Sequence, residues 1–88
     1  MPNVLFITSH GCTPCLRVKR ILKELQTEMS NLAVEEVEYT SDPGTKLSME
    51  NDIQYPPAVF LDGNLIAKGK IDVEMMIKAI RENSWRQN

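Results

Sequence analysis

The hydrophobic pattern changes twice within the first 39 residues, and these changes constrain the fold more than any other feature of the sequence. Residues 3–8 (NVLFIT) are a short apolar run rich in β-formers, typical of a strand buried on both faces. From Thr13 to about Ser30, apolar residues recur every three or four positions, which predicts an amphipathic helix. Its apolar stripe consists of Val18, Ile21, Leu22, Leu25 and Met29. Residues 32–39 predict a second strand, with a loop or bulge where the alternation slips between Val34 and Val37.

The middle of the chain predicts a short helix followed by a hairpin. Residues 41–45 (SDPGT) are typical of a turn, and residues 46–52 of a short helix. Two apolar runs, at 57–62 and 65–68, flank a tight turn at Gly63-Asn64. That pattern indicates an antiparallel hairpin, whereas the strand–helix–strand order before it implies a parallel, right-handed crossover.

The C-terminal part predicts a third helix and completes the fold. Asp72 is expected to cap this helix, whose buried side carries Val73, Met76, Ile77 and Ile80. Residues 83–88 are a polar tail that we expect to fray, with Trp85 folded back on the domain. The resulting order is βαβαββα. It implies a single α/β domain with a four-stranded mixed sheet flanked by three helices, which cover both faces.

The length and the net charge of the chain limit the classes of protein to which it can belong. The 88 residues suffice for one small domain and are too few for two. The net charge of −2 gives no overall attraction to nucleic acid or to an anionic membrane. The longest apolar runs have the length of a strand, too short to cross a bilayer, and the N-terminus lacks the basic start of a signal peptide. We therefore expect a cytoplasmic protein, and in that reducing compartment a close cysteine pair is more often catalytic or metal-binding than structural.

Both cysteines lie in the stretch SHGCTPC, where the first predicted strand gives way to the first helix. Cys12 is expected at the helix N-terminus, where unpaired N–H groups and the helix dipole stabilise a thiolate. For a CxxC pair at such a site a pKa of about 7 is typical, against about 8.5 for free cysteine. Cys15, one turn further along, is expected to be more buried and to keep its proton longer. This asymmetry favours thiol–disulfide exchange, with Cys12 attacking a substrate disulfide and Cys15 resolving the mixed disulfide.

Metal binding and a structural disulfide are the alternatives to redox chemistry. A structural zinc site takes four Cys or His ligands, whereas this chain offers Cys12, Cys15 and a single histidine, His10. A fourth ligand would have to be a carboxylate, a water or a group from a second subunit. A disulfide that closes so short a loop would constrain the unfolded chain little. We therefore expect no metal.

A second motif, IQYPPAVFLDG, occupies residues 53–63. A proline that opens a buried strand cannot donate to the strand ladder, so its position needs a reason. Either a loop simply ends there, or an X–Pro bond is cis and turns the chain sharply beside the active site.

These two motifs and the element order resemble the thioredoxin/glutaredoxin family over almost the whole chain. Residues 42–45 (DPGT) are similar to a loop common in thioredoxins, while the short length and the spacing from Pro57 to Gly63 look more like glutaredoxins. The resemblance implies the thioredoxin-like fold, with Cys12 as nucleophile, Cys15 as resolving cysteine and Pro57 as the cis-proline. The substrate-binding residues that we expect around them are Pro57, Pro56, Tyr55, His10, Thr13 and Pro14.

Several positions depart from the family pattern. Phe6 stands where thioredoxins have a buried aspartate that helps to move the proton of the resolving cysteine. Water or a nearby side chain must then take that proton, and His10 is a candidate because imidazole titrates near neutral pH. An exposed loop histidine is the alternative. Gly11 occupies the place of the tryptophan that usually precedes the CxxC of thioredoxins.

The departures on the glutaredoxin side concern glutathione. Pro56 has no N–H, so an extended glutathione would lose one backbone hydrogen bond there. Lys70 replaces the second glycine of a glycine–glycine–acid signature that Asp72 completes, although Asp72 also serves as a helix cap. Arg17 or Lys19 is a candidate partner for a carboxylate, with a solvated helix face as the alternative.

We therefore expect a monomeric thiol–disulfide oxidoreductase that reduces protein disulfides, with its redox-active disulfide and no metal or organic cofactor. Its partners would be disulfide-containing proteins and an electron-donor reductase, a thioredoxin reductase-type flavoenzyme, with glutathione as the alternative donor; no nucleic acid or membrane partner is expected. The alternative functions are glutathione-dependent glutaredoxin activity, a CxxC module for zinc or an iron–sulfur cluster, and an interaction domain with a redox switch.

Overall fold

The computed structural model describes residues 2–86, and the side chains of residues 2–83. It confirms the predicted βαβαββα order and the α/β fold class. The elements are β1 (Asn3–Thr8), α1 (Thr13–Glu28), β2 (Ala33–Glu38), α2 (Asp42–Glu50), β3 (Ala58–Leu61), β4 (Asn64–Lys68) and α3 (Val73–Arg86). No helix in the described part of the chain is long and apolar enough to span a membrane.

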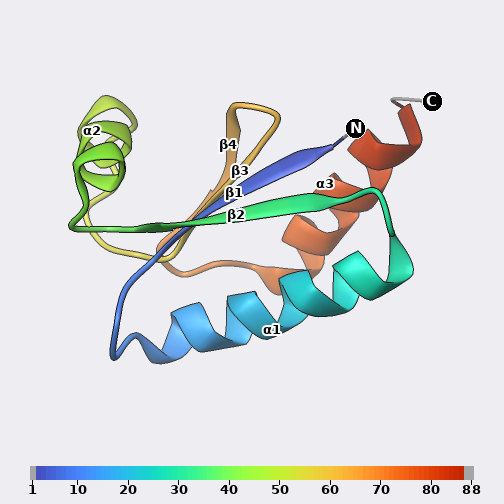
Figure 1. The fold of residues 1–88 in the computed structure, drawn as a ribbon, viewed down its shortest axis with the longest axis horizontal. Coiled ribbons are helices and arrows are strands. Elements are labelled where there is room, and N and C mark those ends of the chain that lie inside the picture. Colours follow the sequence, from blue (N-terminus) through green and yellow to red (C-terminus); the bar gives the residue numbers. More distant parts are fainter. Residues whose placement is uncertain (1, 87–88) are drawn as a thin grey trace.

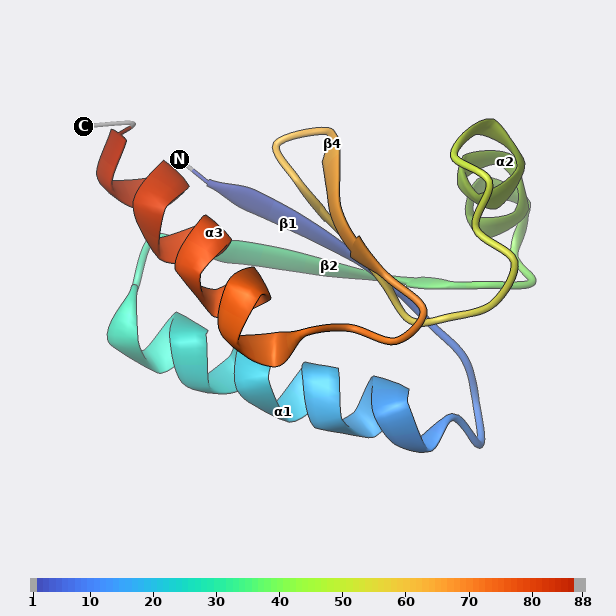
Figure 2. The same ribbon diagram turned by 180° about the vertical axis from the view of Figure 1, so that it is seen from behind.

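The four strands form one mixed sheet in the order β2-β1-β3-β4. β1 runs parallel to β2 and antiparallel to β3, and β3 runs antiparallel to β4. The parallel pair needs a long crossover, which α1 supplies. In Figure 1, α1 and α3 lie on one side of the sheet, while α2 lies on the other side near one end. Figure 2 shows the same layers from behind.

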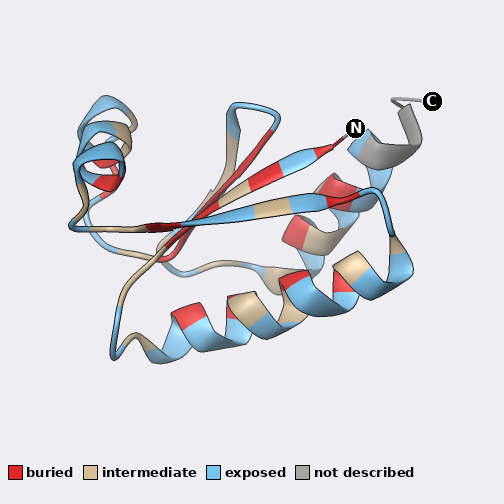
Figure 3. Ribbon diagram, viewed as in Figure 1, coloured by how far each residue is buried: buried red, intermediate tan, exposed pale blue. Residues whose placement is uncertain are grey.

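Two apolar clusters, one on each face, hold the sheet between the helices. The larger cluster joins α1 and α3 to the sheet and includes Phe6, Leu22 and Ile80. The smaller cluster, on the side of α2, contains Ile7 and Phe60 among others. Phe6 and Ile7 fall in different clusters because successive side chains of a strand point to opposite faces. Buried positions are densest in β3, where all four residues are buried (Figure 3).

β2 is regular, so the prediction of a loop or bulge in this strand is wrong. All six of its residues pair with β1 without a shift in register. Val34 and Val37 are three residues apart and therefore lie on opposite faces of the strand. Val34 packs against the larger cluster, while Val37 is buried opposite Ile7. The slip in the hydrophobic alternation reflects a strand that is covered on both faces.

α2 begins at Asp42, within the segment 41–45 that the sequence predicts as a turn. Ser41 is the N-cap, and its Oγ accepts a hydrogen bond from the Gly44 N–H at 3.1 Å. Pro43 fits the first turn of the helix, where a backbone N–H needs no partner. Turn-forming residues start a helix here because the serine side chain satisfies a free N–H.

The hairpin turn is displaced by one residue from its predicted position. It consists of Asp62 and Gly63, which both have positive φ angles of 49° and 86°. Two-residue turns of this kind match the twist of the flanking strands. Asn64, predicted in the turn, instead pairs with Leu61 at the start of β4.

α3 starts as predicted and extends further than predicted. Asp72 Oδ1 accepts a hydrogen bond from the Met75 N–H at 3.2 Å, as a cap does. Met76 and Ile80 are buried on the sheet side. The helix continues to Arg86 through part of the stretch that we expected to fray. Residues 87–88 and the side chain of Trp85 lie outside the described residues.

Candidate active site

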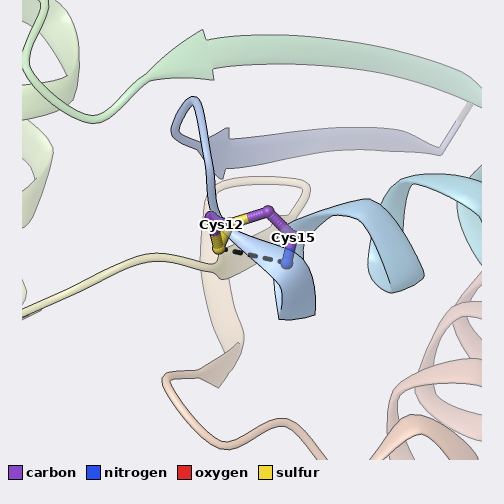
Figure 4. The surroundings of a disulfide bond; sticks show 2 residues. All are labelled: Cys12 and Cys15. Carbon is purple, nitrogen blue, oxygen red and sulfur yellow. Dashed lines mark hydrogen bonds between the residues drawn. A yellow bond between two sulfur atoms is a disulfide. The ribbon is translucent and has the colours of Figure 1, made fainter.

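Cys12 lies where the chain leaves β1 and starts α1. Its backbone is extended (φ −94°, ψ 103°), and its Sγ accepts a hydrogen bond from the Cys15 N–H at 3.1 Å. The sulfur thus takes the place that a serine or aspartate oxygen usually occupies at a helix start. Figure 4 shows this contact together with the Cys12–Cys15 disulfide, whose Cα atoms are 5.2 Å apart. Backbone N–H groups and the helix dipole at a helix start favour negative charge on a group held there.

The two cysteines differ in exposure. Cys15 is 1% exposed and belongs to the larger apolar cluster, whereas Cys12 is half-buried and only borders that cluster. A sulfur at the surface with a second sulfur behind it is the arrangement that dithiol exchange needs. Within the described residues, no three or more His, Cys, Asp or Glu side chains gather as a metal site.

A groove of about 550 Å³ lies beside Cys12. It runs between the start of α1, the segment before β3 and the loop between β4 and α3. The predicted residues that line it are Cys12, Thr13, Pro14, Tyr55, Pro56 and Pro57. His10 is exposed and is not among the lining residues. The tertiary structure thus brings together two motifs that are about forty residues apart in the sequence.

Pro57 is buried at the groove, and the peptide bond between Pro56 and Pro57 is cis. The Pro57 carbonyl accepts a hydrogen bond from the Gly69 N–H at 2.8 Å, which ties the segment before β3 to the loop after β4. Pro56 is half-buried and has no N–H, so it can offer an extended ligand only its carbonyl.

Two tyrosines hold the segment before β3 in place. Tyr39, which follows β2, donates its hydroxyl to the Gln54 carbonyl at 2.9 Å and lies 3.3 Å from the Ile53 carbonyl. Tyr55 packs against Gly69 so closely that a Cβ on this glycine would lie 3.1 Å from the ring. The sequence carried no signal for Tyr39, because its partners are backbone carbonyls of another segment.

The position that the family resemblance assigns to a buried acid is apolar. Phe6 is completely buried, in the same cluster as Cys15. No carboxylate stands at this position to accept the proton of Cys15.

Two charged residues that line the groove are not among the predicted substrate-binding residues. Arg17, a candidate partner for a carboxylate with a solvated helix face as the alternative, lines the groove. Lys70, which replaces the second glycine of a glycine–glycine–acid signature, lines the groove too. Arg17 follows Cys15 by two residues in the sequence. The remaining lining residues that the sequence did not identify are Val18, Gly69, Ile71 and Val73.

Comparisons with known proteins identify the family and the fold. The family model for the thioredoxin domain matches residues 3–82. Mitochondrial thioredoxin 3 from Saccharomyces cerevisiae, in its oxidised form, is similar with a TM-score of 0.70 and 20% identity, over 92% of this chain and 77% of that one. Thioredoxin O2 from Arabidopsis thaliana, also oxidised, is similar with a TM-score of 0.72 and 17% identity, over 93% and 74% of the two chains.

A third similar structure is that of the thioredoxin-like protein BC3987, with a TM-score of 0.65 and 26% identity over 85% of this chain and 96% of that one. The comparison with curated proteins gives no match. The fold and the cysteine pair define a thioredoxin-like protein with a redox-type CxxC. The chain belongs to the thioredoxin domain family, and its fold and cysteine pair indicate thiol–disulfide oxidoreductase activity. The likeness to glutaredoxins in length and spacing stays a prediction.

Proposed function

We propose that this protein reduces disulfide bonds of other proteins by dithiol exchange through Cys12 and Cys15. The observation that carries the proposal is the position of the Cys12 sulfur. It sits at the start of α1 within hydrogen-bond distance of a backbone N–H, and it borders a groove of about 550 Å³. Cys15 lies directly behind it in the core.

Reduction takes two exchange steps. The Cys12 thiolate attacks one sulfur of the substrate disulfide and forms a bond to it, while the other substrate sulfur leaves as a thiolate and takes a proton from water. Cys15 then loses its proton to water and attacks the Cys12 sulfur. The Cys12–Cys15 bond forms, the bond to the substrate breaks, and the second substrate thiolate leaves. Two electrons have passed from the protein to the substrate.

A donor must then reduce the Cys12–Cys15 disulfide. The donor that we propose is the dithiol of a flavoenzyme of the thioredoxin reductase type, and two molecules of glutathione are the alternative. The chemistry needs no metal or organic cofactor on this chain, because sulfur exchange moves both electrons. We place this reaction in the cytoplasm, with the protein as a monomer.

Insulin-disulfide reduction, measured as turbidity with each donor system in turn, tests the proposal. Wild-type protein is expected to turn over, and the Cys12→Ser protein to lose all activity. The Cys15→Ser protein is expected to form a mixed disulfide with the substrate and stop there. A Cys12→Ser protein with full activity would refute the assignment of the nucleophile. Absence of turnover with both donors would refute the function.

A further inference from the structure

The groove beside Cys12 carries positive charge, and we infer that it selects disulfides flanked by acidic residues in a protein substrate. The inference rests on the proposed function and names the kind of substrate that this function would act on. Two cations line the groove: Arg17 from α1 and Lys70 from the loop that precedes α3. Both are exposed, and no acidic residue lines the groove with them.

Neither cation is neutralised by a partner in the described part of the chain. The ion pairs found there join Lys19 to Glu36 and Arg81 to Glu28. Asp72, two residues after Lys70, does not line the groove, and its carboxylate accepts a hydrogen bond from a backbone N–H at the start of α3. The positive charge of Arg17 and Lys70 is therefore available to a ligand.

A neighbouring depression, which shares Tyr55 and Gly69 with the groove, adds one charge of each sign. It is lined by Asp52 and Lys68, and the Lys68 ammonium donates to the Asp52 carbonyl oxygen at 2.9 Å. These two charges cancel, so the depression does not reverse the positive charge of the groove. It is also opposite to the net charge of the whole protein, which is −2.

The backbone of the groove cannot make every hydrogen bond to an extended substrate, so charge contributes to substrate recognition. An extended substrate segment can pair with exposed backbone as an added strand does. Because Pro56 lacks an N–H, one of those backbone hydrogen bonds cannot form. Charges at the rim of a site raise the association rate of substrates of opposite sign and discriminate against substrates of like sign.

Two disulfide-bonded peptide substrates of equal length test the inference, one with glutamates and one with lysines on either side of the cystine. The glutamate peptide is expected to be reduced with a kcat/KM about 3- to 30-fold higher than that of the lysine peptide. This ratio corresponds to the combined free energy of a few exposed charge contacts. The ratio is expected to shrink as salt rises from about 0.05 M to about 1 M, because screening shortens the range of the interaction. The salt dependence can be measured with the wild-type protein, without any variant.

Charge-reversal variants give the second readout. Arg17→Glu and Lys70→Glu are expected to lower or invert the preference for the glutamate peptide. Lys46→Glu is the matched control, because Lys46 is an exposed lysine of α2 outside the groove and its substitution changes the net charge equally. It is expected to leave the preference unchanged. An equal effect of Lys46→Glu would overturn the assignment to the groove.

The outcomes separate this inference from the proposed function. Reduction of both peptides at the same rate, independent of salt, overturns the inference and leaves the disulfide reductase function in place. Reduction of neither peptide overturns both. Glutathione disulfide, a small disulfide that also carries carboxylates, serves as the third substrate. If it is reduced with a higher kcat/KM than the glutamate peptide, a protein segment is not the preferred ligand and the inference fails.

Discussion

The cysteine side of the groove comes from one continuous stretch of chain, residues 12–18, whereas its proline side is assembled from residues 55–57 and 69–73. On the cysteine side, the main contact is local: the Cys15 N–H reaches back to the Cys12 sulfur at 3.1 Å. On the proline side, the contacts join distant segments, as between the Gly69 N–H and the Pro57 carbonyl. One side is set by helix capping and the other by tertiary packing.

This difference indicates which kinds of change should disturb the geometry of each side of the groove. The cysteine side keeps its geometry as long as α1 forms, because the helix start itself positions the sulfur. The proline side depends on a few hydrogen bonds and one ring contact between loops. Changes at the cysteine side should therefore affect the chemistry, and changes at the proline side should affect substrate binding.

The largest expected effect is a difference in reactivity between the two cysteines of the reduced protein. Iodoacetamide should modify Cys12 faster than Cys15 by a factor on the order of a hundred or more, because Cys15 is 1% exposed and reacts only after local opening. Peptide mapping by mass spectrometry measures both rates. In denaturant the two rates should become similar. Equal rates in the folded protein would contradict the asymmetry on which the proposed mechanism depends.

A smaller effect is expected from Gly69→Ala on the proline side. Gly69 has a φ of 65°, and an added Cβ would lie 3.1 Å from the Tyr55 ring. We expect a loss of about 1–2 kcal/mol in the free energy of unfolding and a several-fold rise in KM, with kcat little changed.

Gly63→Ala is the matched control for this substitution. Gly63 also has a positive φ, 86°, but nothing lies within 4 Å of its added Cβ, and it lies outside the groove. It should lose a similar free energy of unfolding without any change in KM. A rise in KM for both variants would show that the effect comes from stability and not from the contact with Tyr55.

Tyr39→Phe should act on the same side of the groove with a smaller effect. It removes the hydroxyl that donates to the Gln54 carbonyl, a net contribution of about 0.5–1.5 kcal/mol. KM for a peptide disulfide is expected to rise about twofold, since the segment before the proline pair loses its anchor. Thr27→Ala, which removes an exposed hydroxyl bond to the Lys23 carbonyl within α1, is the control and should leave KM unchanged. An unaltered KM for Tyr39→Phe would exclude this residue from positioning the groove.

The smallest effect is expected from His10→Ala. The side chain is exposed and does not line the groove, so kcat/KM should change by less than about twofold at neutral pH. The pH profile of turnover, compared between the His10→Ala and wild-type proteins, measures this change in kcat/KM. A loss of ten times or more, restored by added imidazole, would instead make His10 the acceptor of the Cys15 proton.

Local sequence signals predicted the elements and the positions of the two cysteines at the start of α1. Asp72 as a cap and the apolar stripe of α1 rest on interactions within a few residues, which a sequence displays directly. The start of α2 was missed because Ser41, Pro43 and Gly44 serve a turn and a helix start equally well, and only the Ser41–Gly44 hydrogen bond distinguishes them.

The sequence by itself determined that Cys12 would lie at a helix start and Cys15 one turn behind it, because helix periodicity and capping act over a few residues. Only the tertiary structure decided which distant side chains meet that sulfur. Arg17 and Lys70 line one groove, and Tyr39 holds the segment that borders it, because sheet pairing and loop packing bring separate segments together. The sequence pattern shows which face of a helix or strand is apolar, but it does not show which loops will pack near that element.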